Sequence, residues 1–193
     1  MKLDPQTVSE LALEFQPQTY LRVMPAAHMA TPLGMGFGQT RFSSPSKAFK
    51  LIYIARDVAT AIAETIVRDR FEGITERVLD QTEIEEWVIA EVTAFTPLVV
   101  IDLRATGLLK LGVSTDATRA KEHREGRKLS EAVHSSFAVD GLLYSSRLTS
   151  AECVAVYDRA VGIKLEATPA VNLIQHSDLI PALKSIGVAI REA

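Results

Sequence analysis

The chain has 193 residues, of which 47% are hydrophobic and 23% are charged, as in a soluble globular protein of one ordinary domain. Its 21 basic and 24 acidic residues give a net charge of −3, which argues against a dedicated nucleic-acid binder. The single cysteine, Cys153, excludes an internal disulfide and a multi-cysteine zinc site, and it suits a reducing cytosol. The sequence has no secretory signal and no run of 18 apolar residues, so we expect a cytoplasmic protein without a membrane span.

The beginning of the chain predicts a helix, a strand and a long loop. Asp4 can cap a helix and Pro5 fits its first position, and we place this helix at residues 5–15. Residues 18–24 alternate like a strand. Residues 25–39 are rich in proline and glycine and predict a long loop, a feature that is often functional in compact domains.

The middle of the chain predicts three strands around one helix. Residues 49–55 are rich in aromatic and β-branched residues and predict a buried strand. Asp57 is placed to cap a helix that we expect to end near Gly73. Residues 87–94 and 97–103 predict two further strands.

The last part of the chain mixes strands and helices. We expect a helix within residues 115–137, at least from Gly126 onward, a turn at Asp140-Gly141, strands at 142–144, 153–157 and 162–167, and a helix at 178–186. Clustered strands and scattered helices favour an α+β fold over a regular βαβ alternation.

Several patterns have an ordinary structural interpretation. The glycines of Gly34 to Gly38 do not complete the dinucleotide fingerprint, because Gln39 follows and no helix is predicted there. The four histidines are far apart, and no pair has the spacing of a helical metal site. Cys153 lies in a predicted strand and is interpreted as a core thiol. The basic cluster at residues 119–128 is balanced by acidic neighbours and predicts a solvated helix.

Glu64 is less ordinary, because it falls in the apolar stretch of residues 59–67. Burying an unpaired carboxylate is costly. A salt bridge to Arg41 is one explanation, and a functional carboxylate is the other.

The order of four residues resembles the RES domain family. Arg41 stands twelve residues before Tyr53, Glu64 follows eleven residues after that tyrosine, and Ser146 comes after the D-G-x-x-Y pattern that begins at Asp140. The resemblance covers roughly residues 18–160, and residues 161–193 form a C-terminal extension without a recognisable motif. We therefore expect a single RES-like domain over residues 1–193.

The resemblance implies an ADP-ribosyltransferase-like fold, a mixed sheet with flanking helices. It implies a toxin of a bacterial toxin–antitoxin pair whose substrate is NAD, with no metal and no other cofactor. The partner it implies is an antitoxin of the Xre type with a helix-turn-helix domain, which occludes the active site, and homodimerisation is a further implication of the family.

By the same resemblance, Arg41, Tyr53, Glu64 and Ser146 are the catalytic residues, and Arg147 joins Arg41, Tyr53 and Ser146 in binding NAD. Ser145 is the alternative to Ser146. The chemistry fits these residue types, because breaking the nicotinamide–ribose bond creates a cationic centre that a carboxylate stabilises. An arginine offers a fork of donors to the diphosphate, and a tyrosine offers a flat face to the nicotinamide.

The sequence leaves the acceptor open. Water or phosphate as acceptor gives an NAD glycohydrolase or phosphorylase that depletes NAD. A protein side chain as acceptor gives a protein ADP-ribosyltransferase. A non-catalytic binding module on the same fold is the third interpretation, because a fold does not by itself imply an activity.

Overall fold

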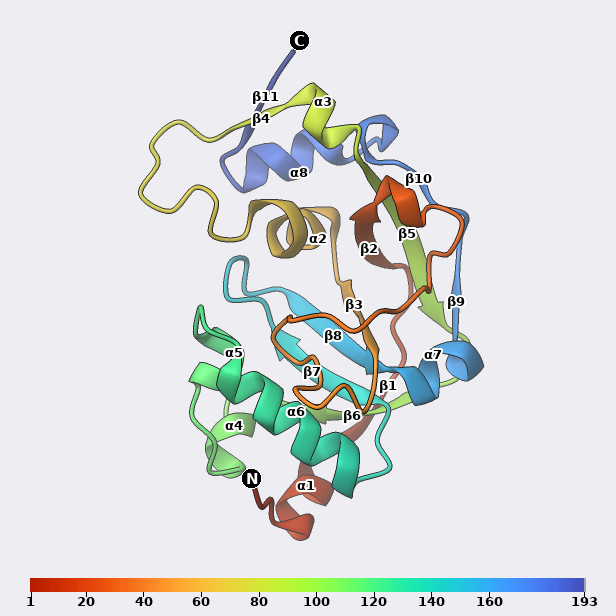
Figure 1. Cartoon of the computed structure of the whole chain (residues 1–193), viewed down its shortest axis with the longest axis vertical. Coiled ribbons are helices and arrows are strands. Elements are labelled where there is room, and N and C mark those ends of the chain that lie inside the picture. Colours follow the sequence, from red (N-terminus) through yellow and green to blue (C-terminus); the bar gives the residue numbers. More distant parts are fainter. Residues whose placement is uncertain (193) are drawn as a thin grey trace.

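The computed structural model describes residues 1–192, and a nine-stranded mixed sheet lies at its centre (Figure 1). The strands follow the order β1-β6-β7-β8-β3-β2-β5-β10, and β9 also pairs with β5. Strands β6 and β7 pair in parallel, whereas the other pairs of this sheet are antiparallel. A separate parallel pair joins β4 and β11. The strands are β1 Ala12–Phe15, β2 Tyr20–Pro25, β3 Leu51–Ala55, β4 Val78–Asp80, β5 Trp87–Ala94, β6 Leu98–Asp102, β7 Gly141–Ser145, β8 Glu152–Tyr157, β9 Leu165–Ala167, β10 Val171–Asn172 and β11 Ala189–Arg191.

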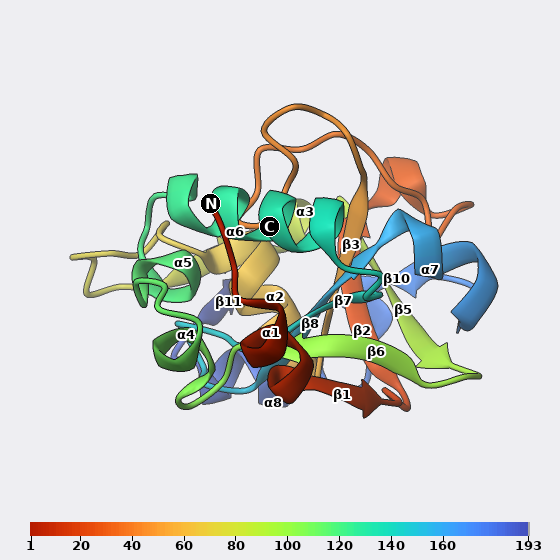
Figure 2. The same cartoon turned by 90° about the horizontal axis from the view of Figure 1, so that it is seen from below.

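Helices cover both faces of this sheet, which confirms the predicted α+β class (Figure 2). On one face, α6 buries Leu129 and Val133 in the larger apolar core. On the other face, α7 buries Ala160 and Val161 in a second core. The helices are α1 Pro5–Leu11, α2 Val58–Ile62, α3 Gln81–Ile84, α4 Gly107–Lys110, α5 Asp116–Arg119, α6 Arg124–Ser136, α7 Asp158–Lys164 and α8 Leu179–Ser185, with short turns η1 Ala26–His28, η2 Ala63–Val67 (a π-helical turn) and η3 Leu173–Gln175.

The sheet opens between β2 and β3. These strands pair at one position only, Leu21 opposite Ala55. By contrast, β2 pairs with β5 along its whole length, and β3 does the same with β8. Because β2 and β3 diverge beyond that pair, residues from both faces of the sheet line the gap between them.

Two glycines permit close backbone contacts in the fold. A Cβ atom at Gly126 would lie 2.6 Å from the carbonyl oxygen of Arg41 and 2.5 Å from that of Ala117. A Cβ atom at Gly141 would lie 2.3 Å from the carbonyl oxygen of Ala155. Any other residue would force the backbones apart, so Gly126 lets α6 pack against the turn that carries Arg41.

Three predicted elements require correction. Residues 12–15 do not continue the first helix, because they pair with β6 as β1. The helix after Asp57 ends at Val67 rather than near Gly73, because Arg68 has a positive φ of 42° that breaks the helix. Residues 162–164 belong to α7, so the strand predicted at 162–167 is reduced to β9.

The other predicted elements are confirmed within a few residues. Residues 115–137 form two helices, α5 and α6, and Gly126 lies inside α6 rather than at its start. The C-terminal extension contributes β9 and β10, which pair with β5, and β11, which pairs with β4.

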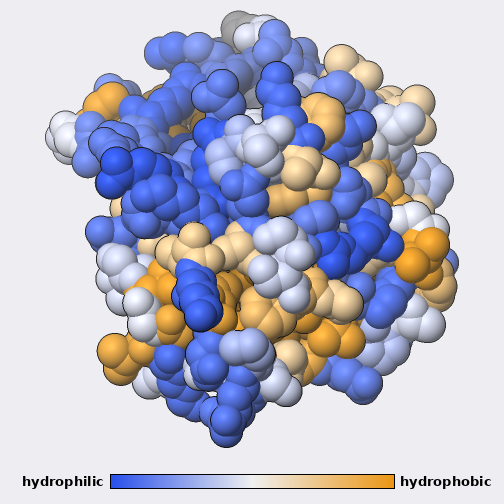
Figure 3. Space-filling model, turned by 60° about the horizontal axis from the view of Figure 1, so that its bottom comes forward, coloured by the Kyte–Doolittle hydropathy of each residue, from blue (hydrophilic) through white to orange (hydrophobic). Residues whose placement is uncertain are grey.

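The surface mixes hydrophilic and apolar residues, and apolar residues gather toward the lower half of the face in Figure 3. Within residues 1–192 no helix combines the length and hydropathy needed to span a membrane.

Candidate functional site

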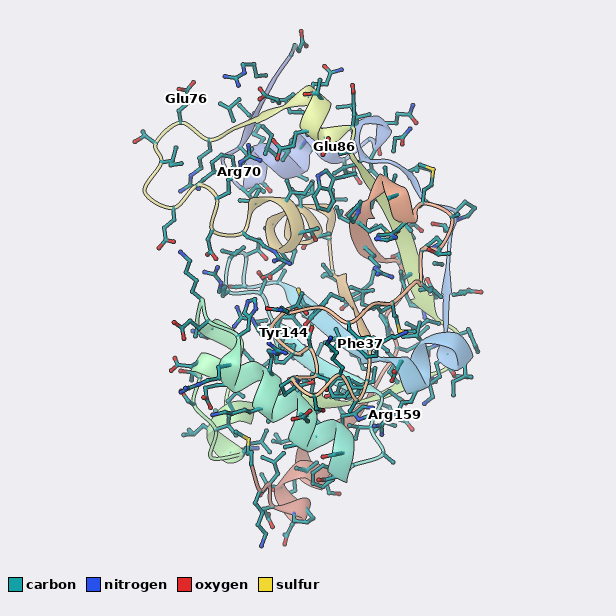
Figure 4. The ribbon with its side chains drawn as sticks, in the orientation of Figure 1. Phe37, Arg70, Glu76, Glu86, Tyr144 and Arg159 are labelled. Atoms are coloured by element: carbon teal, nitrogen blue, oxygen red, sulfur yellow. The ribbon has the colours of Figure 1, made fainter. Side chains whose placement is uncertain are left out.

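A cleft of about 350 Å³ occupies the gap between β2 and β3. This volume falls at the lower end of the range of ~300–1,000 Å³ typical of small-molecule sites. Arg41, Tyr53, Glu64 and Arg147, four of the residues predicted from the sequence, line it. Tyr144 also lines the cleft and lies near the middle of the molecule in Figure 4.

Ser146 fixes the carboxylate of Glu64. Its Oγ donates a hydrogen bond of 2.6 Å to Oε1 of Glu64 and accepts hydrogen bonds from the backbone N–H groups of Leu148 and Thr149. A hydroxyl has one donor and two acceptor sites, so these three bonds use all of them. Ser146 is 2% exposed and does not line the cleft. In this structure its hydroxyl therefore holds Glu64 in place rather than facing the cleft.

Ser145, the alternative serine, lies elsewhere. It belongs to β7 and pairs with Glu152 of β8. The register therefore brings Ser146, and not Ser145, to Glu64.

Glu64 is also held by its backbone position in the π-helical turn η2. Such turns are rare and occur frequently at functional sites. The preceding helix α2 begins at Asp57, whose side chain accepts a hydrogen bond of 2.7 Å from the N–H of Thr60, as predicted. The Thr60 hydroxyl in turn contacts that of Thr149 at 2.8 Å. One loop, residues 146–150, thus anchors both α2 and the Glu64 carboxylate.

Arg41 lies in the turn before β3 and is 8% exposed. Its Nη1 donates a hydrogen bond of 2.7 Å to the carbonyl of Ala120. Burial lowers the pKa of Arg41, and the negative charge of Glu64 opposes this shift. In the described part of the chain, however, no ion pair within 4.0 Å joins the two side chains, so the salt-bridge explanation of Glu64 is wrong. The other guanidinium N–H groups make no hydrogen bond within residues 1–192 and are available to a ligand.

The Tyr53 hydroxyl makes hydrogen bonds to the turn that carries Arg41. It accepts a hydrogen bond of 2.9 Å from the N–H of Phe42 and contacts the Thr40 hydroxyl at 2.8 Å. Burial raises the pKa of Tyr53 to about 12, so the hydroxyl stays protonated. Because Thr40 and Phe42 flank Arg41, Tyr53 positions this arginine, and Tyr53 itself lines the cleft.

The charge of the cleft lining is strongly positive. Five cationic side chains and two carboxylates line it, an excess of three positive charges in a chain whose net charge is −3. Asp69 forms an ion pair with Arg147, which leaves Glu64 as the cleft carboxylate without an ion pair in residues 1–192. The cations are Arg22, Arg41, Arg68, Lys121 and Arg147.

Arg22 is a cleft residue that the sequence analysis missed. It lies on β2 and donates hydrogen bonds of 2.5 Å to the carbonyl of Pro32 and 2.8 Å to that of Gly34. Burial lowers its pKa to about 10, so it remains charged at neutral pH. The sequence signal that could have identified Arg22 is a charged residue within an apolar segment, the same kind of signal that singled out Glu64. Lys121 was also missed, because its cluster was interpreted as a solvated helix.

The other candidate groups have structural roles or stay untested. Cys153 is buried in β8 beside the cleft, and burial raises the pKa of its thiol. The His123 Nδ1 atom bonds to the carbonyl of Gln39 at 3.0 Å. Residues 1–192 contain no group of three or more His, Cys, Asp or Glu side chains placed to hold a metal ion. The absence of a metal requirement stays a prediction.

Fold and site together define an α+β domain with a basic small-molecule cleft built around one fixed carboxylate. The chain belongs to the RES domain family, whose model matches residues 19–176. It is 38% identical over 81 residues to "Probable toxin y4kH" of Sinorhizobium fredii, a match that spans 41% of this chain and 63%, less than two thirds, of that relative. Its fold is similar to that in the crystal structure of the M. tuberculosis MbcT–MbcA toxin–antitoxin complex, with a TM-score of 0.64, 18% identity and coverage of 88% and 92% of the two chains. This likeness supports the mixed sheet with flanking helices that the sequence predicted.

Proposed function

We propose that this protein is the toxin of a toxin–antitoxin pair and that it cleaves NAD at the bond between nicotinamide and ribose. The observation that carries the proposal is one carboxylate, Glu64, fixed by Ser146 within a cleft whose lining carries an excess of positive charge. A dinucleotide substrate matches this pattern, because its diphosphate carries two negative charges and its reacting carbon becomes positive.

The reaction needs little covalent chemistry from the protein. The bond between ribose C1′ and the nicotinamide nitrogen breaks, and its electron pair stays on the nitrogen, which becomes neutral. C1′ then develops positive charge, which the Glu64 carboxylate stabilises, and an acceptor oxygen attacks it and loses its proton to solvent. A fixed charge of this kind typically contributes ~10²–10³ to the rate.

The remaining residues bind and orient the substrate in this proposal. Arg41 presents its unused N–H donors to the diphosphate, a geometry that suits phosphate oxygens. The Tyr53 ring packs against the nicotinamide, while its hydroxyl keeps Arg41 in place. Arg147 stands beside Arg41 in the lining and adds positive charge for the same ligand.

The comparisons support the toxin part of the proposal. The curated relative is named a probable toxin, and the structural neighbour is a chain from a toxin–antitoxin complex. We extend this to a partner antitoxin of the Xre type that covers the cleft, to action in the cytoplasm and to a homodimer, all of which follow from the family resemblance.

Incubation of the purified protein with NAD, with and without phosphate, tests the proposal by mass spectrometry. Free nicotinamide with ADP-ribose indicates water as acceptor, and a phosphorylated ADP-ribose indicates phosphate. ADP-ribose attached to an added lysate protein indicates the transferase. Glu64→Gln should abolish most of the product, whereas Glu91→Gln, an exposed carboxylate of β5, should not. Intact NAD in every reaction would contradict the proposal and favour a binding module.

A further inference from the structure

The loop that follows η1 passes along the rim of the cleft and carries an exposed aromatic residue. We call residues 29–39 the strap loop. Gly36 and Gly38 of this loop line the cleft, and Phe37 between them is 54% exposed. In Figures 1 and 2 the segment before β3 lies on the same side of the sheet as α6. Figure 4 draws Phe37 in the same central part of the molecule as the cleft residue Tyr144.

Hydrogen bonds fix the strap loop on both sides of residues 35–38. Arg22 holds the carbonyls of Pro32 and Gly34 at one end. His123 holds the carbonyl of Gln39 at the other. Between them, no hydrogen bond within residues 1–192 holds residues 35–38, and a Cβ atom at Gly36 would meet nothing within 4 Å. Glycines on both sides of Phe37 allow this short segment to change its direction without moving the tied ends.

Phe37 contributes little to the apolar core. Its ring is more than half exposed, and Lys50 lies over it with Nζ 5.0 Å from the ring centroid. The neighbouring Met35 packs against the second core, but Phe37 is in none of the apolar core clusters of the described residues. A single exposed aromatic side chain is ordinary on a protein surface. Phe37 itself does not line the cleft, but the glycines on both sides of it do, and this position makes it a candidate contact for a flat ligand group that extends past the rim.

We propose that Phe37 is the stacking platform for the adenine base of the dinucleotide, a role that rests on the proposed function. If the nicotinamide ribose lies at Glu64, the second nucleotide must extend toward the rim, because a cleft of about 350 Å³ is small for a dinucleotide. The rim near η2 carries the cations Arg68 and Lys121, which suit phosphates rather than a neutral base. The strap loop offers the aromatic face, on which any nucleobase can stack.

Calorimetric binding of ADP-ribose tests this inference independently of turnover. Phe37→Ala should weaken ADP-ribose binding by about tenfold or more, equivalent to ~1.4 kcal/mol. Phe37→Tyr should stay within about twofold of the unaltered protein, because it keeps the stacking face. Phe95→Ala is the matched control, since Phe95 is 53% exposed but, unlike Phe37, has no neighbour in the chain that lines the cleft.

Nicotinamide mononucleotide, which lacks adenine, provides a second arm. Phe37→Ala should leave the binding of nicotinamide mononucleotide unchanged, because this ligand has no adenine base to stack on Phe37. Equal loss for both ligands, or no loss of ADP-ribose binding, would overturn the inference while leaving NAD cleavage intact. A protein that binds ADP-ribose through Phe37 but cleaves no NAD would retain the adenine site and refute the proposed function. A protein that neither binds ADP-ribose through Phe37 nor cleaves NAD would refute both the adenine site and the proposed function.

Discussion

Replacing Ser146 by alanine removes the hydroxyl that fixes Glu64, and the structure allows the loss to be estimated. The variant loses a hydrogen bond to a charged group and leaves the N–H groups of Leu148 and Thr149 without their acceptor. A bond to a charged group contributes ~1.5–3 kcal/mol and a neutral bond roughly 1 kcal/mol. Some rehydration of the two N–H groups is expected, so the free energy of unfolding should fall by ~2–4 kcal/mol. For a chain of this size the melting temperature should then fall by roughly 5–15 °C.

The same change should slow NAD cleavage more than it weakens NAD binding. Glu64 keeps its charge but loses its fixed orientation, so we expect kcat to fall about 10-fold to 100-fold, part of the contribution of a well-placed electrostatic group. Thermal unfolding gives the stability, and nicotinamide release at a temperature well below the transition gives kcat and KM. Ser145→Ala is the matched control and should behave like the unaltered protein. A Ser146→Ala protein that is less stable but has unchanged kcat would refute the positioning role.

Three further perturbations test the structural account. Gly126→Ala should raise KM for NAD and lower the free energy of unfolding by ~1–3 kcal/mol, because its Cβ would lie 2.6 Å from the Arg41 carbonyl oxygen. Gly162→Ala in α7 is the control, because a Cβ atom there would meet nothing within 4 Å. In denaturation and kinetic assays this control should leave both KM and the free energy of unfolding unchanged. Tyr53→Phe keeps the ring but removes the acceptor of the Phe42 N–H. The free energy of unfolding should therefore fall by ~1–3 kcal/mol, and KM for NAD should rise. An unchanged KM would show that the Tyr53 hydroxyl does not position Arg41. Burial, followed by the charge of Arg159, lowers the pKa of His134 below its ordinary value of 6.5, while Asp158 opposes this. A histidine with a lowered folded-state pKa stabilises the fold above pH 6.5 and loses this contribution as pH falls toward the folded pKa. Unfolding measured between pH 7.5 and 5 should therefore show a decline that His134→Gln reduces, and identical pH profiles would contradict the assignment.

Local sequence signals predicted the elements whose side chains alternate or cap clearly. The strand predicted at residues 87–94 is β5, and the Asp57 cap binds the Thr60 N–H as expected. The failures have non-local causes. Residues 12–15 have good helix formers, but pairing with β6 far along the chain holds them extended. No local signal marks such a partner.

The candidate site was only partly predictable for a similar reason. Glu64 could be singled out because a carboxylate in an apolar stretch is costly. Arg22 carries the same kind of signal, but an arginine in an alternating strand ordinarily faces solvent. Only the separation of β2 from β3, a property of the tertiary structure, turns it toward a cleft. The bond that joins Ser146 to Glu64 likewise depends on a loop 82 residues away.

The central claim is that the fixed carboxylate of Glu64 drives cleavage of NAD, and Glu64→Gln tests it most directly. This change keeps the size of the side chain and its ability to accept the Ser146 hydrogen bond, but it removes the negative charge. The measurement is the rate of nicotinamide release from NAD, with NAD affinity and melting temperature determined on the same preparations. We predict a rate lower by about 100-fold or more with little change in affinity, because the charge acts mainly on the transition state. A folded Glu64→Gln protein that binds and cleaves NAD at the unaltered rate would contradict the account.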